Sequence, residues 1–354
     1  MTRLALLLLV LFSDGCAALR PAGYAGHPHV VAWNAVLPEA VREDAAFPIV
    51  EERLQVGRLD VHLDRHRPVV PPKDVLVVLV HGGGGHGRLL APIGLMLARA
   101  GYESVAPDLP GFGLTVVPSS VPLTWSLWVD VVREVVRQER VRTGRRVVLC
   151  GLSIGGTLAW HAAAGNGDVD GVMVTTLLDL RDAAVRAQVA TSPALSRISD
   201  GLGKGGALDG WWVPLSWVAP LDLMTTDEAV LAQYRKDPFV ARAMPFGFWR
   251  SMGRTPPAVE PEVMMTPLLL AHPGADAWTP TALSLPTFER FAGKKTLVRL
   301  SNGSHLPLEV PARDELAAAM VAFLDEVGKG AEARDGAASR QGGVEGAPKP
   351  RVTR

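Results

Sequence analysis

The chain has 354 residues, of which 48% are hydrophobic and 20% charged, and 36 basic residues balance 36 acidic ones. This is the composition of a globular protein with a large core in one or two domains. Zero net charge without a basic stripe argues against a nucleic-acid-binding protein, so no nucleic-acid partner is expected.

The first residues have the pattern of an export signal. Arg3 precedes a nine-residue apolar run, 4–12, which is too short to span a bilayer, since a spanning helix needs ~20 residues. The sequence Ser13-Asp14-Gly15-Cys16-Ala17 follows and resembles a bacterial lipoprotein signal. This resemblance implies export to a bacterial cell envelope and a lipid anchor on Cys16. Cleavage within residues 17–25 would instead give a periplasmic or secreted protein.

Strand and helix patterns alternate along most of the chain. Residues 45–67 alternate apolar and polar side chains, which predicts two antiparallel edge strands. Further strands are predicted at 75–80, 102–106, 146–150, 169–177, 267–271 and 296–300, and helices at 88–100, 123–142, 279–291 and 312–327. This alternation predicts an α/β fold with a mostly parallel central sheet and helices on both faces.

One long segment, 180–258, interrupts the alternation and contains no convincing strand. An insertion of this size between two sheet strands is expected to form a mainly helical cap over a site. Its tryptophans either line an apolar pocket or attach the cap to the sheet, and the second role is the more common one. The expected domains are a signal segment (1–16), a linker (17–44), a core (45–179 and 259–327), the cap (180–258) and a disordered tail (328–354).

The most informative motif lies at the end of the predicted strand 146–150. That strand runs directly into Gly151-Leu152-Ser153-Ile154-Gly155, and a helix-forming stretch follows. A serine on such a sharp strand-to-helix turn is held in a strained, exposed position, and small flanking glycines avoid collisions with the strand and helix. Ser153 is therefore the candidate nucleophile.

A serine hydroxyl needs a base to take its proton and an acid to orient that base. In this type of turn the partners follow in the order Ser, acid, His, on loops after later strands. Asp276 follows the predicted strand 267–271, and His305 follows the strand 296–300. These two residues are the expected acid and base. Asp179, after the strand that follows the serine, is the alternative acid.

A glycine-rich turn, 82–87, follows the apolar strand 75–80 and suggests an oxyanion hole. The expected donors are the backbone N–H groups of Ile154 and Gly83, with Gly84 as the second choice after Gly83. His81 is expected to brace this turn, and His86 to lie at the surface. The turn lacks the Gly-Lys-Ser/Thr ending of a phosphate-binding loop.

Other polar residues are expected to be structural. Asp108 is predicted to fix a turn through backbone amides, and His161 to pack within its helix. His272 has no companion at metal-ligand spacing, and no metal site or cofactor is predicted. Cys150 has the role of a small hydrophobic residue in its strand.

These motifs resemble the α/β-hydrolase superfamily over residues 45–327. Within it, His81-Gly82 followed by Gly85-His86-Gly87-Arg88 looks like the lysophospholipase and monoglyceride lipase branch, which includes aminopeptidase-like relatives. So do three parts of the cap, Leu221-Asp222, Thr226-Asp227 and 234–239. The resemblance implies hydrolysis of small-molecule or monoacyl lipid esters.

The expected function is thus a serine hydrolase that cleaves carboxylic esters through Ser153, Asp276 and His305 and an acyl-enzyme. The same three residues also serve an aminopeptidase or amidase, or an acyltransferase. A non-catalytic, lipid-anchored binding protein on an inactive hydrolase scaffold is the alternative outside enzymology.

Overall fold

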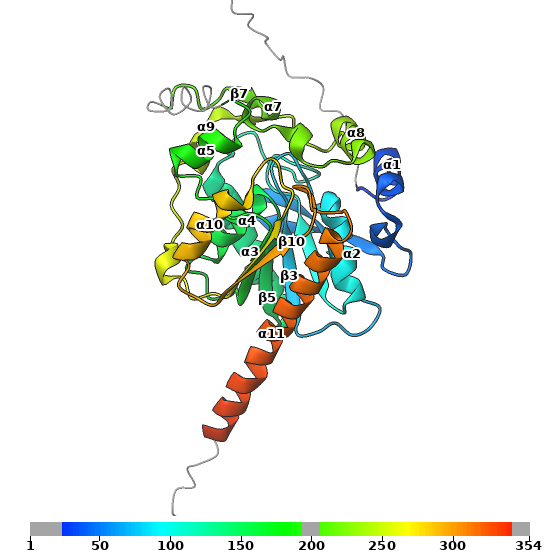
Figure 1. The fold of residues 1–354 in the computed structure, drawn as a ribbon, viewed down its shortest axis with the longest axis vertical. Helices are drawn as coiled ribbons and strands as arrows, with labels where there is room; N and C mark the ends of the chain where they lie inside the picture. The colour runs from blue at the N-terminus through cyan, green and yellow to red at the C-terminus, as the bar shows by residue number, and fades with distance from the viewer. Residues whose placement is uncertain (1–22, 193–205, 342–354) are drawn as a thin grey trace, which may run out of the picture.

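A computed structural model describes residues 23–192 and 206–341. Its centre is an eight-stranded sheet with the strand order β1-β2-β4-β3-β5-β6-β9-β10 (Figure 1). The strands are β1 (Ile49–Val56), β2 (Leu59–His66), β3 (Val75–Val80), β4 (Glu103–Pro107), β5 (Arg146–Gly151), β6 (Gly171–Val174), β9 (Leu268–Pro273) and β10 (Lys295–Leu300). The strand β2 pairs antiparallel with β1 and β4, and every other pair in this sheet is parallel. The predicted α/β fold and the antiparallel edge are confirmed.

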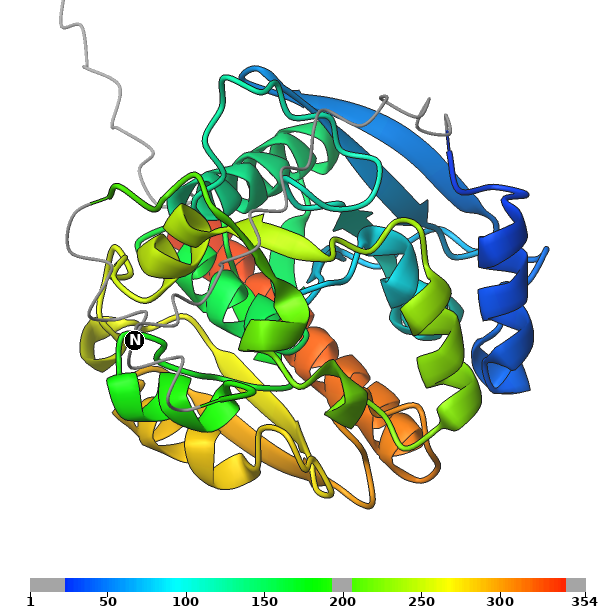
Figure 2. The same cartoon turned by 90° about the horizontal axis from the view of Figure 1, so that it is seen from above.

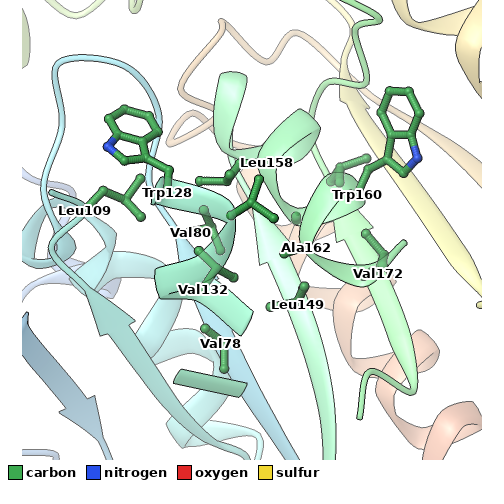
Figure 3. Packing of buried hydrophobic residues seen from close by; sticks show 14 of the residues in the cluster. Val78, Val80, Leu109, Trp128, Val132, Leu149, Leu158, Trp160, Ala162 and Val172 are labelled. Carbon is green, nitrogen blue, oxygen red and sulfur yellow. The ribbon is translucent and has the colours of Figure 1, made fainter. Parts of the chain in front are cut away.

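The central strands are apolar on both faces because helices cover both. On one face, α3 (Trp125–Thr143), α4 (Ile154–Ala163) and α10 (Thr281–Arg290) pack on side chains such as Val78, Leu149 and Val172 (Figure 3). On the other, α2 (Ala91–Arg99) and α11 (Ala312–Gln341) pack on Val77, Val148 and Cys150. Cys150 is buried as expected. Because alternate side chains of each strand pack on opposite faces of the sheet, the register of the strands is fixed. The loops at their carboxyl ends therefore have fixed positions.

The cap insertion is mainly helical, but it also contains a small sheet. In its described residues, 180–192 and 206–258, the elements are α5 (Ala183–Val189), β7 (Trp212–Pro214), α7 (Leu215–Val218), the 3₁₀ turn Leu221–Leu223, α8 (Glu228–Lys236), β8 (Ala243–Pro245) and α9 (Phe246–Met252). β7 and β8 pair antiparallel, so the expectation of no strand was wrong. Three residues are too few to show the alternation by which strands are recognised in a sequence. Figure 2 shows the cap elements spread over one end of the core.

The segment expected to be a linker contains a helix. Within 17–44, α1 (Pro28–Val36) lies beside α8 (Figure 1), and a 3₁₀ turn (Glu39–Val41) lies against α2. Trp33, Leu37 and Val41 are buried against side chains of the cap and core. The sequence of α1 carries no charged residue, so it lacks the polar face that would have revealed a surface helix.

The C-terminal helix α11 continues to Gln341 and so extends into the expected tail, 328–354 (Figure 1). The part 342–354 lies outside the described residues, as do the expected signal segment and Cys16. In residues 23–192 and 206–341, no helix is both long and apolar enough to cross a membrane.

Candidate active site

Ser153 occupies the sharp turn between β5 and α4. Its backbone φ is 55°, an angle that a non-glycine residue rarely adopts. Thr175 and Thr176, which follow β6, hold the turn: the Ser153 N–H donates to Thr175 Oγ1 at 3.1 Å, and Thr176 Oγ1 donates to the Ser153 carbonyl at 2.7 Å. A Cβ on Gly155 would lie 2.3 Å from the Val80 carbonyl oxygen. Glycine is required there, because α4 starts directly against β3.

His305 lies between the serine and the expected acid. Its Nε2 is 2.7 Å from Ser153 Oγ, and its Nδ1 is 2.8 Å from Asp276 Oδ2. An ionised carboxylate can only accept, so the Nδ1 proton faces Asp276 and Nε2 is left to accept from the Ser153 hydroxyl. The three predicted residues therefore form one hydrogen-bonded chain.

Asp276 is held in place by its own loop. Asp276 Oδ1 accepts the backbone N–H groups of Trp278 and Thr279, and Asp276 Oδ2 accepts the Thr279 hydroxyl at 2.7 Å. Burial alone would raise the pKa of Asp276, but the hydrogen bonds from His305 and Thr279 hold it below its usual value. Thr279 was not among the predicted site residues. Its position in the sequence, before Pro280, suggested a helix start instead.

Asp179, the alternative acid, has other partners. Its carboxylate lies 2.7 Å from the Arg181 guanidinium and 3.0 Å from that of Arg290. Burial would raise its pKa, but the hydrogen bonds from Arg181 lower it to about 2. The structure thus brings Asp276, and not Asp179, to the histidine.

The glycine-rich turn after β3 borders the serine. Gly83 lines the cavity at Ser153, and a Cβ on Gly83 would lie 3.6 Å from Ile154 Cγ2. Ile154 is the first residue of α4, and its N–H therefore has no intrahelical acceptor. The second choice, Gly84, has a φ of 78°, and a Cβ there would meet the Tyr234 hydroxyl at 2.3 Å. This geometry favours Gly83 and Ile154 as a donor pair.

His81 braces the same turn. Its Nε2 accepts the Leu109 N–H at 3.0 Å, and its Nδ1 is 2.8 Å from the Gly82 carbonyl oxygen. Burial lowers the pKa of His81 to about 4, which keeps the ring neutral. A neutral ring can donate to one of these partners and accept from the other, as a brace requires.

A cavity of about 70 Å³ opens at Ser153 and His305. Its lining is mostly apolar and comes from four parts of the chain: α1, the core, the cap and the loop that carries Asp276. The lining side chains include Trp33, Leu89, Leu152, Met224, Tyr234, Trp278 and Leu306. An apolar cavity with a few convergent polar groups is typical of a small-molecule site.

His86 differs from its expected surface position. It is 1% exposed, it stacks on Tyr24 with ring centroids 5.0 Å apart, and its Nε2 lies 2.9 Å from Asp237 Oδ2 of the cap. Two motif residues far apart in the sequence, His86 and Asp237, therefore join the core to the cap.

Asp108 has the structural role that was expected. It accepts the backbone N–H groups of Gly87 and Leu114 at 2.6 and 2.7 Å, and also the Tyr24 hydroxyl at 2.7 Å. His161 accepts the indole N–H of Trp125 at 3.2 Å within the core, and His272 is fully buried. Neither histidine reaches the serine through any contact among the described residues.

One group of potential metal ligands exists in the described part of the chain. Atoms of Glu51, His62 and Asp64 lie within 4.8 Å of one another. Both Asp64 oxygens accept from Arg88, at 2.7 and 2.9 Å, and Glu51 accepts the Tyr24 N–H at 2.7 Å. A guanidinium in this position already balances the carboxylate charge, so we interpret the group as an ion-pair network.

Comparison with known proteins gives the family. Residues 71–309 match the model of the family described as serine aminopeptidase, S33. The thermostable monoacylglycerol lipase of Bacillus sp. (strain H-257) is 30% identical over 128 residues, which are 36% of this chain and 50% of that protein. The chain thus matches about half the length of this relative.

Solved structures agree on the fold. The monoacylglycerol lipase of Paleococcus ferrophilus superposes with a TM-score of 0.61 at 21% identity, covering 75% of this chain and 99% of that one. A soluble variant of the Saccharomyces cerevisiae monoglyceride lipase gives a TM-score of 0.61 at 15% identity, over 79% and 97%. At such identities the likeness shows the fold alone. The family match covers more than half of the chain, and the chain therefore belongs to the serine aminopeptidase S33 family of α/β hydrolases, as its motifs had indicated.

Proposed function

We propose that the protein is a serine hydrolase that cleaves carboxylic esters, monoacyl lipid esters among them, with Ser153, His305 and Asp276 as its catalytic triad. The observation that carries this proposal is the continuous hydrogen-bonded chain from Ser153 Oγ through His305 to Asp276, with the serine at the edge of a cavity. The membership of the chain in a family of serine hydrolases supports it further.

In this mechanism Ser153 Oγ attacks the acyl carbonyl while His305 Nε2 takes its proton. The buried carboxylate of Asp276 stabilises the imidazolium that results. The oxyanion forms beside the N–H groups of Gly83 and Ile154, whose donation stabilises its charge. His305 then returns the proton to the leaving alcohol, and water, activated by the same histidine, releases the acid from the acyl-enzyme.

The apolar lining of the cavity supports an ester with an aliphatic part as the substrate. Leu89, Leu152, Met224 and Leu306 offer no hydrogen-bonding side chain, so they favour a hydrocarbon group over a sugar or an ion. Three proteins in the comparison are named as monoacylglycerol or monoglyceride lipases, which is consistent with this substrate class.

The family description names an aminopeptidase, which makes amide hydrolysis the second candidate. Amide hydrolysis would use the same serine and histidine, with protonation of a leaving amine instead of an alcohol. Transfer of the acyl group to an alcohol would differ only in the last step. Parallel assays with p-nitrophenyl butyrate, a monoacylglycerol, an amino-acid amide and an alcohol acceptor separate the three reactions.

The test of the catalytic proposal is the variant Ser153→Ala. Ester turnover should fall by roughly 10³-fold or more, since no other group replaces the nucleophile. Labelling by a fluorophosphonate should modify the peptide that contains Ser153 and disappear in the variant. The control is Ser120→Ala, because the Ser120 hydroxyl accepts a hydrogen bond from Arg58 at the surface and does not line the cavity. An unlabelled, inactive wild type would favour the non-catalytic binding protein, and near-normal turnover in Ser153→Ala would refute the triad.

For location, we propose an exported protein with a lipid anchor on Cys16. The support is the sequence of residues 1–17 alone. Expression of the full chain in a bacterium should place the protein in the membrane fraction, and Cys16→Ser should release it from that fraction. If wild type and variant both fractionate as soluble periplasmic proteins, the anchor is refuted and cleavage within residues 17–25 is the better interpretation.

A further inference from the structure

The cavity at Ser153 has a wall that does not come from the hydrolase core or the cap. Trp33 lines it from α1, and α1 lies before residue 71, where the match to the family begins. The chain therefore adds a large aromatic side chain to its active site from a segment outside the family region.

Trp33 is held firmly against this cavity. Trp33 is 4% exposed and packs in one cluster with Val230 and Tyr234 of α8 and with Leu308, which follows the His305 loop. Met224 and Leu306, two other lining residues, pack against the same cluster. Replacing the indole would thus change the wall without touching Ser153.

The helix that carries Trp33 is anchored at its start. The Tyr24 and Ala25 N–H groups both donate to Glu51, at 2.7 Å each, and the Tyr24 hydroxyl donates to Asp108 at 2.7 Å. His29 Nε2 lies 3.4 Å from Asp237 Oδ2 of the cap. With partners in the core and in the cap, α1 has little freedom to swing away from the cavity.

The cavity at Ser153 has a small volume. At about 70 Å³ it has less than half the volume of an engineered apolar cavity of about 150 Å³ that holds one benzene molecule. A group bound wholly within this space has only a few carbon atoms. Trp33 and Trp278 contribute the two largest side chains of its lining.

The indole nitrogen of Trp33 gives a second, independent observation. Trp33 Nε1 is buried and has no hydrogen-bond partner among the described residues. A buried N–H without an acceptor is rare in proteins and calls for an explanation such as an ordered water.

From these observations we infer that Trp33 is a specificity-determining residue: it closes the cavity at Ser153 and restricts the substrate to esters whose bound apolar group is short. This inference rests on the proposed ester hydrolysis and narrows its substrate class: among monoacyl lipid esters, it admits those whose group bound in the cavity is short. It assigns to the N-terminal segment the selection of substrate size, while the core supplies the reacting groups.

The test is the full chain with Trp33→Ala, assayed with two series of esters. One series lengthens the acyl group from butyrate to octanoate on p-nitrophenol, and the other lengthens the alcohol of an acetate ester. Each methylene that becomes buried is worth about fourfold in affinity, so the octanoate-to-butyrate ratio of kcat/KM, or the matching ratio in the alcohol series, should rise about tenfold or more. Trp33→Leu should give a smaller rise.

The matched control is Val30→Ala on the same helix. Val30 is buried in a different cluster, with Tyr24, Leu114 and Phe239, and does not line the cavity. The substitution Val30→Ala removes packing from α1. If a general loosening of the helix were the cause, the kcat/KM ratio would therefore change alike in Val30→Ala and Trp33→Ala. If the octanoate-to-butyrate kcat/KM ratio, or the matching ratio in the alcohol series, rises in Trp33→Ala and Trp33→Leu but not in Val30→Ala, the inference that Trp33 limits substrate size is supported. If these kcat/KM ratios are equal in wild type and in both Trp33 variants, the inference is overturned.

A binding measurement separates this inference from the proposed reaction. In the Ser153→Ala background, the Kd ratio for octanoate and butyrate esters should change on Trp33→Ala as the kcat/KM ratio does. If wild type hydrolyses no ester but the Kd ratio changes on Trp33→Ala, the proposed function is refuted and the role of Trp33 in selecting ligand size is supported. If hydrolysis depends on Ser153 but neither the kcat/KM ratio nor the Kd ratio changes in either series, the role of Trp33 is refuted and the proposed function is supported.

Discussion

The core and the segments laid over it have different tasks in this molecule. The core places Ser153, Asp276 and His305 on loops at the carboxyl ends of β5, β9 and β10, and the sheet fixes their spacing. The described residues of the cap (180–192 and 206–258) and of the N-terminal segment (23–44) add no member to that hydrogen-bonded chain. They supply Met224, Tyr234 and Trp33 to the cavity walls. Under the two proposals made above, the core supplies the reacting groups, and the overlying segments contribute to the selection of substrate.

The two regions also differ in how they use tryptophan. Trp125, Trp128 and Trp160 of the core are at most 1% exposed, whereas Trp211, Trp212 and Trp217 of the cap are more than 60% exposed. Phe248 of α9 attaches the cap by packing on Trp128, with ring centroids 4.5 Å apart. The expected structural role of cap aromatics therefore applies to Phe248 but not to these three tryptophans.

The largest expected effect tests whether the chemistry resides in the core as described. Asp276→Asn should lower ester turnover by about 10⁴-fold, because an amide favours the wrong tautomer of His305. Asp179→Asn should leave kcat within a few-fold, since Asp179 pairs with Arg181 and Arg290. The measurement is kcat for p-nitrophenyl butyrate in both variants. The reverse order of effects would make Asp179 the acid.

The placement of the reacting residues could be predicted because it depends on local patterns. Ser153 follows a β-forming run and precedes a helix, and Asp276 and His305 each follow an apolar strand in the order that this fold requires. Topology then fixes which loops meet. Thr279 could not be found in this way, because a threonine before a proline is also an ordinary helix start.

The overlying segments were harder to predict for a physical reason. The helix α1 is stabilised by burial of Trp33 and Leu37 against α8, a contact between parts of the chain about 200 residues apart that no local period reveals. His86 looked like a surface residue because its buried partner, Asp237, lies in the cap. Local patterns identify elements, and long-range contacts decide which of them pack.

The tryptophans allow a direct comparison of packing in the two regions. Trp160→Ala in the core should lower the free energy of unfolding by about 4 kcal/mol, through lost burial and the remaining cavity. Trp212→Ala in the cap, with a side chain 63% exposed, should change it by less than about 0.5 kcal/mol. Urea unfolding monitored by circular dichroism measures both. Similar losses in the two variants would mean that the cap tryptophan is buried in solution.

A smaller effect is expected at the boundary between the regions, where His62 lies between two carboxylates. Its Nε2 is 2.9 Å from Glu51 and its Nδ1 is 3.2 Å from Asp108. Burial would lower the pKa of His62, but these carboxylates raise it to about 9. Because the folded pKa is raised, the stabilisation is complete below the unfolded pKa, near 6.5, and is lost as the pH rises through about 9.

The difference between the two pKa values corresponds to about 3 kcal/mol of stability. The free energy of unfolding of wild type should therefore fall from about pH 6.5 to above pH 9 by more than that of His62→Gln. The comparison of the two proteins removes the contribution of other groups that titrate in this range. Parallel pH profiles for wild type and variant would show that His62 is neutral in the folded state.

The smallest expected effect concerns the attachment of the N-terminal segment to the core. Tyr24→Phe removes the hydroxyl that donates to Asp108 at 2.7 Å and keeps the ring that packs on His62, His86 and Phe239. Loss of one hydrogen bond to a buried charge should cost about 1.5 kcal/mol. Limited proteolysis before residue 45 should become faster, because α1 depends on this anchor.

The matched control for Tyr24 is Tyr102→Phe. The Tyr102 hydroxyl also donates to an aspartate, Asp325, but that side chain is 41% exposed and joins two parts of the core. Its loss should cost less than about 1 kcal/mol, since water replaces the partner, and should leave proteolysis before residue 45 unchanged. If Tyr24→Phe and Tyr102→Phe have equal stability and equal cleavage rates, the hydroxyl of Tyr24 does not hold the N-terminal segment. The position of Trp33 would then depend on the contacts of α1 with the cap, and the wall of the cavity would follow the cap rather than the core.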